Sequence, residues 1–256
     1  MPTLDLRAEA RKHSPVVVDM PSIREAGVAT WRGRMINEHS SARVFEGLAK
    51  QFAAAGYDDL VPEVRGFADE ERRHGVLCGS VVEALGGEAL AEIPEGDEYP
   101  AHEDAETPLE AALRNMLSIC CLSETVAVSL IGAERLEMPE GELRDLLTNI
   151  YADEVGHSRF GWRTLARIAP TLDAGTKERL ADYLEVAFAH LVEHELSHLP
   201  LSSNPPPEGA VYGLCSGADA RVLFFDTVID VIVPGLEAQG IPARRAWIAA
   251  REALAA

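Results

Sequence analysis

Two short stretches of this sequence carry the same arrangement of acidic residues and histidine. Residues 68–75 read ADEERRHG and residues 152–158 read ADEVGHS, so Glu71 precedes His74 by three positions, as Glu154 precedes His157. Glu and His at positions i and i+3 lie on one face of a helix, about 60° apart. Each pair can therefore offer one carboxylate and one imidazole to the same metal ion.

The Glu-x-x-His spacing by itself is weak evidence. A chain of 256 residues with 28 Glu and 8 His is expected to contain about one such pair from its composition alone. Three pairs occur, the third being Glu195 and His198. The placement of each pair on its helix must therefore decide which of them do chemistry.

Apolar residues recur at helical spacing along most of the chain, and no stretch alternates in the way a half-buried strand does. The sequence therefore predicts an all-α fold, in which glycine and proline residues mark the ends of the helical stretches. The expected helices cover about 22–55, 60–84, 107–136, 142–168, 177–199 and 218–233, with a short last helix after residue 242. We expect Pro234 and Gly235 to end the helix over 218–233.

This pattern predicts three regions. Residues 1–21 form an N-terminal arm that is mostly extended. Residues 22–169 form a four-helix bundle, and residues 170–256 form a C-terminal helical extension packed on it. The acidic segment over 87–106 is a long connection between the second and third helices.

The predicted hairpins bring two further carboxylates toward the Glu-x-x-His pairs. Glu124 and Glu154 are equidistant from Pro139, which lies inside the turn expected between two helices. Glu38 and Glu71 are equidistant from a point near the turn at 56–59, with a mismatch of about 4 Å at the helical rise of 1.5 Å per residue. Each hairpin is thus predicted to set a lone Glu opposite a Glu-x-x-His pair.

The connection over 87–106 decides whether the two hairpins can act together. Fully extended, it spans roughly 66–72 Å, which is enough to cross the length of a bundle. Four carboxylates and two imidazoles could then surround one point. Burying four carboxylates without cations would cost many kcal/mol, and ligands of this kind without thiolates suit iron or manganese.

The six residues and their order resemble the ferritin-like diiron-carboxylate superfamily. The resemblance covers about residues 22–168 and rests on Glu38, EERRH at 70–74, Glu124 and DEVGH at 153–157. It implies a centre of two iron ions, with manganese or a mixed pair left open. The implied ligands, which include the catalytic and bridging carboxylates, are Glu38, Glu71, His74, Glu124, Glu154 and His157. Glu70 and Asp153 resemble the acids that orient ligand histidines in the oxygenase branch.

The chain extends about 90 residues past the fourth helix and lacks the cysteine-rich electron-transfer domain of many rubrerythrins. In this it looks more like the bacterial diiron oxygenases. The resemblance implies an enzyme that activates O2 and oxidises a small, mostly apolar organic substrate, with electrons from an external donor. The alternative is a rubrerythrin-like peroxide reductase or a ferroxidase that handles iron.

Other residues near the predicted centre have two interpretations each. Cys78 lies four positions after His74, and Tyr151 lies three before Glu154, so both can face the centre, but core packing is the simpler explanation for each.

The helix over 177–199 carries a row of histidines, which are His190, His194 and His198. This row is most simply an exposed polar face. In one alternative, His194 is an extra metal ligand of the centre or contacts one of its ligands. In the other, these residues form the H-x-x-E-H pattern of a zinc protease.

The composition limits the partners. A formal net charge of −19 disfavours nucleic acid and anionic membranes, which would repel the chain. None of the four cysteines forms C-x-x-C, and we expect neither a signal peptide nor a membrane span. A cytoplasmic protein that binds a small molecule is the expectation, and a homodimer is compatible with it.

Overall fold

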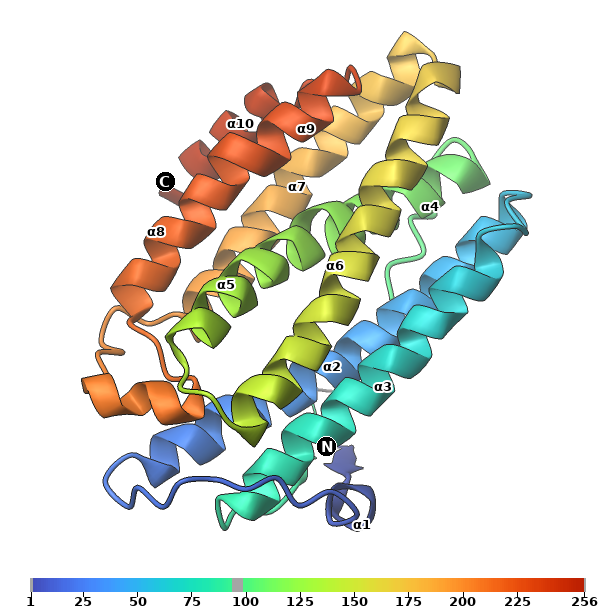
Figure 1. The fold of residues 1–256 in the computed structure, drawn as a ribbon. Coiled ribbons are helices and arrows are strands. Elements are labelled where there is room, and N and C mark those ends of the chain that lie inside the picture. The colour runs from blue at the N-terminus through green and yellow to red at the C-terminus, as the bar shows by residue number, and fades with distance from the viewer. Residues whose placement is uncertain (1, 94–98, 256) are drawn as a thin grey trace. The chain divides into compact units, whose positions relative to one another are not determined.

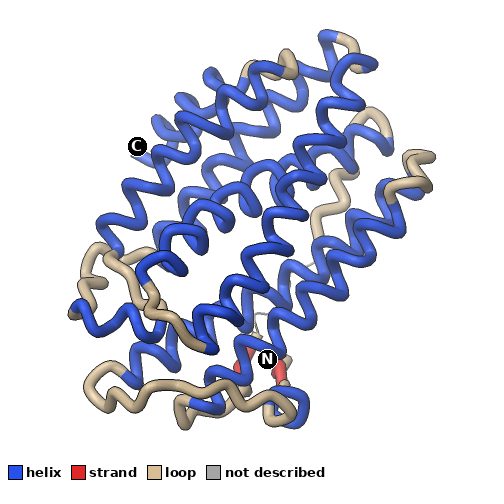
Figure 2. Tube along the Cα trace, in the orientation of Figure 1, coloured by secondary structure: helices blue, strands red, loops and turns tan. Residues whose placement is uncertain are grey.

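The computed structural model describes residues 2–93 and 99–255, and nearly all of its regular structure is helical (Figure 2). The predicted all-α helical-bundle class is confirmed. The helices are α1 (Arg7–Ala10), α2 (Arg24–Ala54), α3 (Val61–Ala84), α4 (Pro108–Met116), α5 (Glu124–Glu137), α6 (Glu142–Ile168), α7 (Ala174–His198), α8 (Gly217–Thr227), α9 (Val233–Ala238) and α10 (Ala243–Ala255).

One short sheet departs from the predicted absence of strands. Strand β1 (Thr3–Asp5) pairs antiparallel with β2 (Leu90–Glu92), so Leu4 lies opposite Ala91. The N-terminal arm is therefore not extended throughout, because β1 leads directly into α1. The two strands are too short to show the alternation on which a sequence-based prediction depends.

The chain forms two compact units, each built from separate stretches. The first comprises Met1–Pro100, Ala133–Asp153 and Pro205–Cys215. The second comprises Ala101–Gly132, Glu154–Asn204 and Ser216–Ala256. Each unit therefore contains residues from before and from after residue 170, where the sequence predicted a boundary.

The first unit is organised by the hairpin of α2 and α3, which lie side by side (Figure 1). Gly56, at the end of α2, has a φ of +78°, a conformation that glycine adopts without a side-chain clash. Phe45 and Phe67 pack edge to face across the hairpin, with ring centroids 5.5 Å apart. Phe45 and Phe67 are the same number of residues from Gly56 along the chain, and their contact fixes the register of the two helices.

The second unit contains α4, α7 and α10, and α7 packs against both of the others (Figure 1). Phe188 of α7 and Trp247 of α10 meet with ring centroids 5.3 Å apart. Glu110 of α4 is fully buried, and its carboxylate accepts hydrogen bonds from Arg114 at 2.8 Å and from Arg179 of α7 at 2.9 Å. Charge-assisted bonds to both oxygens satisfy this buried acid and tie α4 to α7.

Two helices contain a π-helical segment that the sequence analysis did not predict. Leu117–Ser123 joins α4 to α5, and Val228–Ile232 joins α8 to α9. The expectation that Pro234 ends its helix was wrong, since the helix continues through Pro234 to Ala238. Proline is tolerated in the first turn after such a widened segment, because its missing N–H needs no partner there.

The joined helix Pro108–Glu137 is the one helix among the described residues that is long and apolar enough to cross a membrane. Half of its most apolar window is buried inside the protein. This favours the core helix of a soluble protein over a membrane span.

Replacing Gly161 by alanine is expected to destabilise the second unit. A Cβ at this position of α6 would lie 2.5 Å from Cys120 Cβ and 3.0 Å from its carbonyl carbon. Overpacking of this kind costs about 1–3 kcal/mol, which urea unfolding would measure. Gly156→Ala on the same helix is the control: its Cβ meets nothing within 4 Å, so this variant should be about 0.5–1 kcal/mol more stable. Equal stability of the two variants would contradict the prediction.

Candidate metal centre

The first unit brings three of the predicted ligands together. Glu38 of α2 and Glu71 and His74 of α3 offer ligand atoms that lie within 4.8 Å of one another. His74 Nδ1 is 3.5 Å from Glu38 Oε2. Glu71 and His74 are 1% and 0% exposed, so the group lies inside the unit.

The hairpin register explains which residue faces Glu38. The sequence analysis set Glu38 opposite Glu71, with a mismatch of a few residues. In the structure, Glu38 and His74 lie close together, and they are equidistant from residue 56 along the chain, as Phe45 and Phe67 are. The imidazole therefore lies directly across from Glu38, and Glu71, one turn earlier on the same face of α3, completes the group.

His74 is oriented by an acid from another helix. Its Nε2 lies 3.0 Å from Asp153 Oδ2 of α6, and Asp153 also accepts a hydrogen bond from Arg73. This leaves Nδ1 directed at Glu38. A carboxylate on the far nitrogen fixes the tautomer and the ring angle of a ligand histidine. The role predicted for Asp153 therefore has a matching contact, whereas that of Glu70 stays a prediction.

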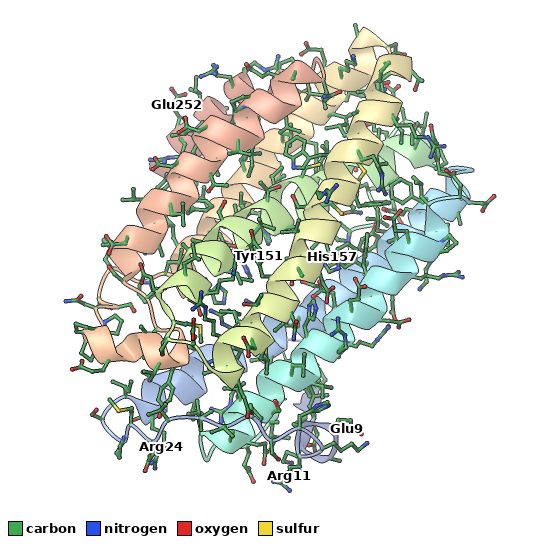
Figure 3. All side chains as sticks on the ribbon, viewed as in Figure 1. Glu9, Arg11, Arg24, Tyr151, His157 and Glu252 are labelled. Atoms are coloured by element: carbon green, nitrogen blue, oxygen red, sulfur yellow. The ribbon has the colours of Figure 1, made fainter. Side chains whose placement is uncertain are left out.

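The second unit brings the other three predicted ligands together. Glu124, the first residue of α5, and Glu154 and His157 of α6 offer ligand atoms within 4.8 Å of one another. His157, labelled in Figure 3, has its Nδ1 3.1 Å from Glu154 Oε2 and 3.9 Å from Glu124 Oε2. All three side chains are buried.

The π-helical segment helps to position Glu124. The segment ends at Ser123, so the turn before Glu124 is wider than an α-helical turn. The next residue, Thr125, shares a 2.9 Å hydrogen bond with Ser158 and accepts one of 3.0 Å from Trp162. These contacts hold the start of α5 against α6, beside the ligand group.

The two groups have the same chemical composition. Each contains two carboxylates and one imidazole, and in each the histidine presents Nδ1 to a carboxylate oxygen. Buried Glu and His groups of this kind can hold a metal ion. The donor set fits, because oxygen and imidazole ligands suit iron or manganese and a cation removes the cost of the buried negative charge.

Cys78 and Tyr151 have surroundings that favour packing over chemistry. Cys78 of α3 is fully buried. The ring of Tyr151 stacks under the Arg135 guanidinium, whose carbon is 4.4 Å from the ring centroid. Their predicted roles beside the ligands stay predictions.

The histidines of α7 lie on an exposed face, as the simplest interpretation predicted. None of them belongs to either buried ligand group among the described residues. Partial burial, followed by repulsion from His198 and His190, lowers the pKa of His194 to about 4. Burial raises the pKa of Glu195 to about 7. The third Glu-x-x-His pair thus lacks the buried partner carboxylates of the other two.

The sequence analysis missed an ion pair in the first unit. Arg34, one turn before Glu38 on α2, donates a hydrogen bond to Glu134, whose side chain is 8% exposed. Burial raises the pKa of Glu134, although Arg34 opposes this shift. Gly213 lies so close to the carboxylate of Glu134 that a Cβ on residue 213 would be 2.1 Å from Glu134 Oε1. No spacing rule links residues 34, 134 and 213, so the sequence carries no signal for this cluster.

No protein-family model and no curated protein sequence matches this chain.

Replacing Asp153 by asparagine is expected to weaken iron binding about 10–100-fold, the usual cost of losing a partner behind a ligand histidine. Asparagine keeps the size of the side chain but removes the charge that orients His74. Competition with a chromophoric chelator would measure the change. Asp145→Asn, an acid on the same helix outside both ligand groups, should leave iron affinity unchanged. Equal affinities in the two variants would contradict the role given to Asp153.

Proposed function

We propose that this chain is a ferritin-like, non-haem diiron oxidoreductase that uses O2 to oxidise a small, mostly apolar organic substrate. The observation that carries the proposal is the matched pair of ligand groups. Each supplies two carboxylates and one imidazole, and all of these side chains except the partly exposed Glu38 are buried. Manganese or a mixed manganese–iron pair would suit the same ligands.

The proposal requires that the six ligands serve one centre with two metal ions. The sequence supports this through the spacing of both hairpins and the length of the connection over 87–106. The continuity of helix α6 also supports a single centre. Asp153, which contacts His74, and Glu154, which contacts His157, are consecutive residues of one unbroken helix. A di-metal centre between facing helices is an established use of such ligands.

In the proposed mechanism the protein holds the metals and controls their surroundings. When bound, a pair of ferrous ions supplies two electrons to O2. Glu38, Glu71, Glu124 and Glu154 would hold the ions, and their negative charge would favour the ferric over the ferrous state. His74 and His157 would offer Nδ1 as a ligand, with Asp153 holding the proton on Nε2 of His74. An external donor must return the electrons before each new turnover.

The stretch after Glu124 supports an apolar substrate. Residues 127–132 read AVSLIG, and each of the six is partly exposed although Ser129 is the one polar residue among them. A helix of this composition is expected to be covered completely in a tightly packed core. Partial exposure close to a metal ligand leaves apolar surface against which a small substrate can lie. Ser123 and Ala127 are the small side chains nearest to Glu124 along the chain.

A second candidate is favoured by the net charge of −19. A strongly acidic surface attracts cations, as a ferroxidase or a rubrerythrin-like peroxide reductase would need for iron handling. Size-exclusion chromatography separates the candidates. A cage-sized particle would indicate iron storage, whereas a monomer or homodimer would agree with a substrate oxygenase. The proposed location is the reducing cytoplasm in either case, since none of the four cysteines forms a C-x-x-C pair.

The experiment that tests the proposal is anaerobic loading with Fe(II) followed by exposure to O2. We expect about two irons per chain and near-ultraviolet absorption from ferric ions with carboxylate and imidazole ligands. A panel of small apolar compounds would then be screened for oxidation in the presence of a reductant. Absence of bound iron, or iron that O2 does not oxidise, would overturn the proposal.

A further inference from the structure

The three histidines of α7 form a row that the proposed diiron chemistry does not use. His190, His194 and His198 follow one another at intervals of four residues, and all three side chains are exposed. The rings of His190 and His194 are stacked, with centroids 6.2 Å apart. The rings of His194 and His198 are closer, with centroids 4.5 Å apart.

Both ring separations are within reach of a shared metal ion. A transition metal lies about 2.0–2.1 Å from each imidazole nitrogen, so two rings on one ion have centroids at most about 6.5 Å apart. Histidines at positions i and i+4 of a helix are an established pair of ligands for zinc. His194 and His198 have the separation of two rings on one ion as they stand, and the exposed ring of His190 reaches an ion on His194 after a change of rotamer.

The tautomer of His198 also suits metal binding. Its Nδ1 lies 2.8 Å from the carbonyl oxygen of His194, which can only accept a hydrogen bond. Nδ1 therefore carries the proton, and the lone pair is on Nε2, the nitrogen available to a ligand. A backbone carbonyl on the far nitrogen is a common way of orienting a ligand histidine.

We propose that α7 carries an exposed chelating site for one divalent transition metal, in which His194 is the shared ligand. The ion binds His194 together with either His190 or His198, since the two outer residues are two helical turns apart and cannot both reach it. Imidazole ligands suit zinc, nickel and copper. Glu193, exposed beside His194, adds negative charge that favours a cation. The site lies on one helix and does not depend on the buried centre.

The test uses the untagged full-length chain on a support that carries immobilised Ni2+. An immobilised ion is reached only by exposed imidazoles, so the buried ligands His74 and His157 cannot contribute. We expect the protein to be retained at pH 8 and to elute with imidazole. His194→Ala should lower the imidazole concentration needed for elution at least tenfold.

The matched variants separate a shared chelate from independent histidines. His190→Ala and His198→Ala should each keep most of the retention, because one pair survives in each. The double variant H190A/H198A should behave like His194→Ala. His13→Ala removes an exposed histidine elsewhere and should change nothing.

Two results would overturn the inference. One is a wild-type chain that is not retained. The other is a loss of retention that is equal for each of the three single variants, which would indicate separate weak contacts. Because every replaced side chain is exposed, folding of the variants is not at risk.

Discussion

A chain with Glu154→Ala is expected to bind no iron, compared with about two ions in the unchanged protein. Glu154 lies in the second ligand group, 3.1 Å from His157, and is 3% exposed. Its removal leaves one carboxylate and one imidazole in that group. In a shared centre the bridging carboxylates hold both ions, so the loss extends to the first group. Metal analysis after anaerobic loading and desalting would measure it.

The companion variant Glu71→Ala tests the same idea from the first unit and should give the same complete loss. Loss of only one iron in either variant would mean that each group binds its own ion, which contradicts the shared centre. Glu63→Ala is the control, because it removes an exposed carboxylate from α3. Glu154→Gln keeps the side-chain volume, so circular dichroism of both Glu154 variants can exclude unfolding as the cause.

The second large effect is expected at the pair of Arg34 and Glu134. Glu134→Ala leaves the guanidinium of Arg34, whose side chain is 20% exposed, without its acid. Breaking a buried pair from one side costs about 3–5 kcal/mol, because an uncompensated charge stays inside the protein. Arg34 also lies over the Trp31 ring, 5.1 Å from its centroid, and cannot easily turn to solvent. Urea unfolding would measure the loss.

The double variant R34M/E134L separates the charge effect from the packing effect. Apolar side chains of similar size remove both charges, and such replacements are commonly neutral or stabilising. We therefore expect stability within about 1 kcal/mol of the unchanged protein. A double variant as unstable as Glu134→Ala would show that packing, and not the lost partner, is responsible. Arg135→Met is the control. It makes an arginine-to-methionine change of the same size at a guanidinium that stacks on Tyr151.

The sequence by itself determined the helices and the spacing of the candidate ligands within each helix. Apolar spacing and the stops at Gly56 and Gly86 placed α2 and α3 close to their observed ends. The Glu-x-x-His pairs are local, because three residues along a helix always lie on one face. Such features need only the geometry of one helix. The same local rules failed at the π-helical segments and at Pro234, where packing against other elements overrides propensity.

The tertiary structure decided which side chains face one another across helices. The rotation of α3 brought the imidazole of His74, together with the carboxylate of Glu71, to Glu38. It also brought Asp153 to the far nitrogen of His74, although this acid precedes the other Glu-x-x-His pair. Contacts of this kind depend on how far each helix is turned about its axis. One residue of register turns a helix by about 100°, which sequence spacing across a loop does not fix.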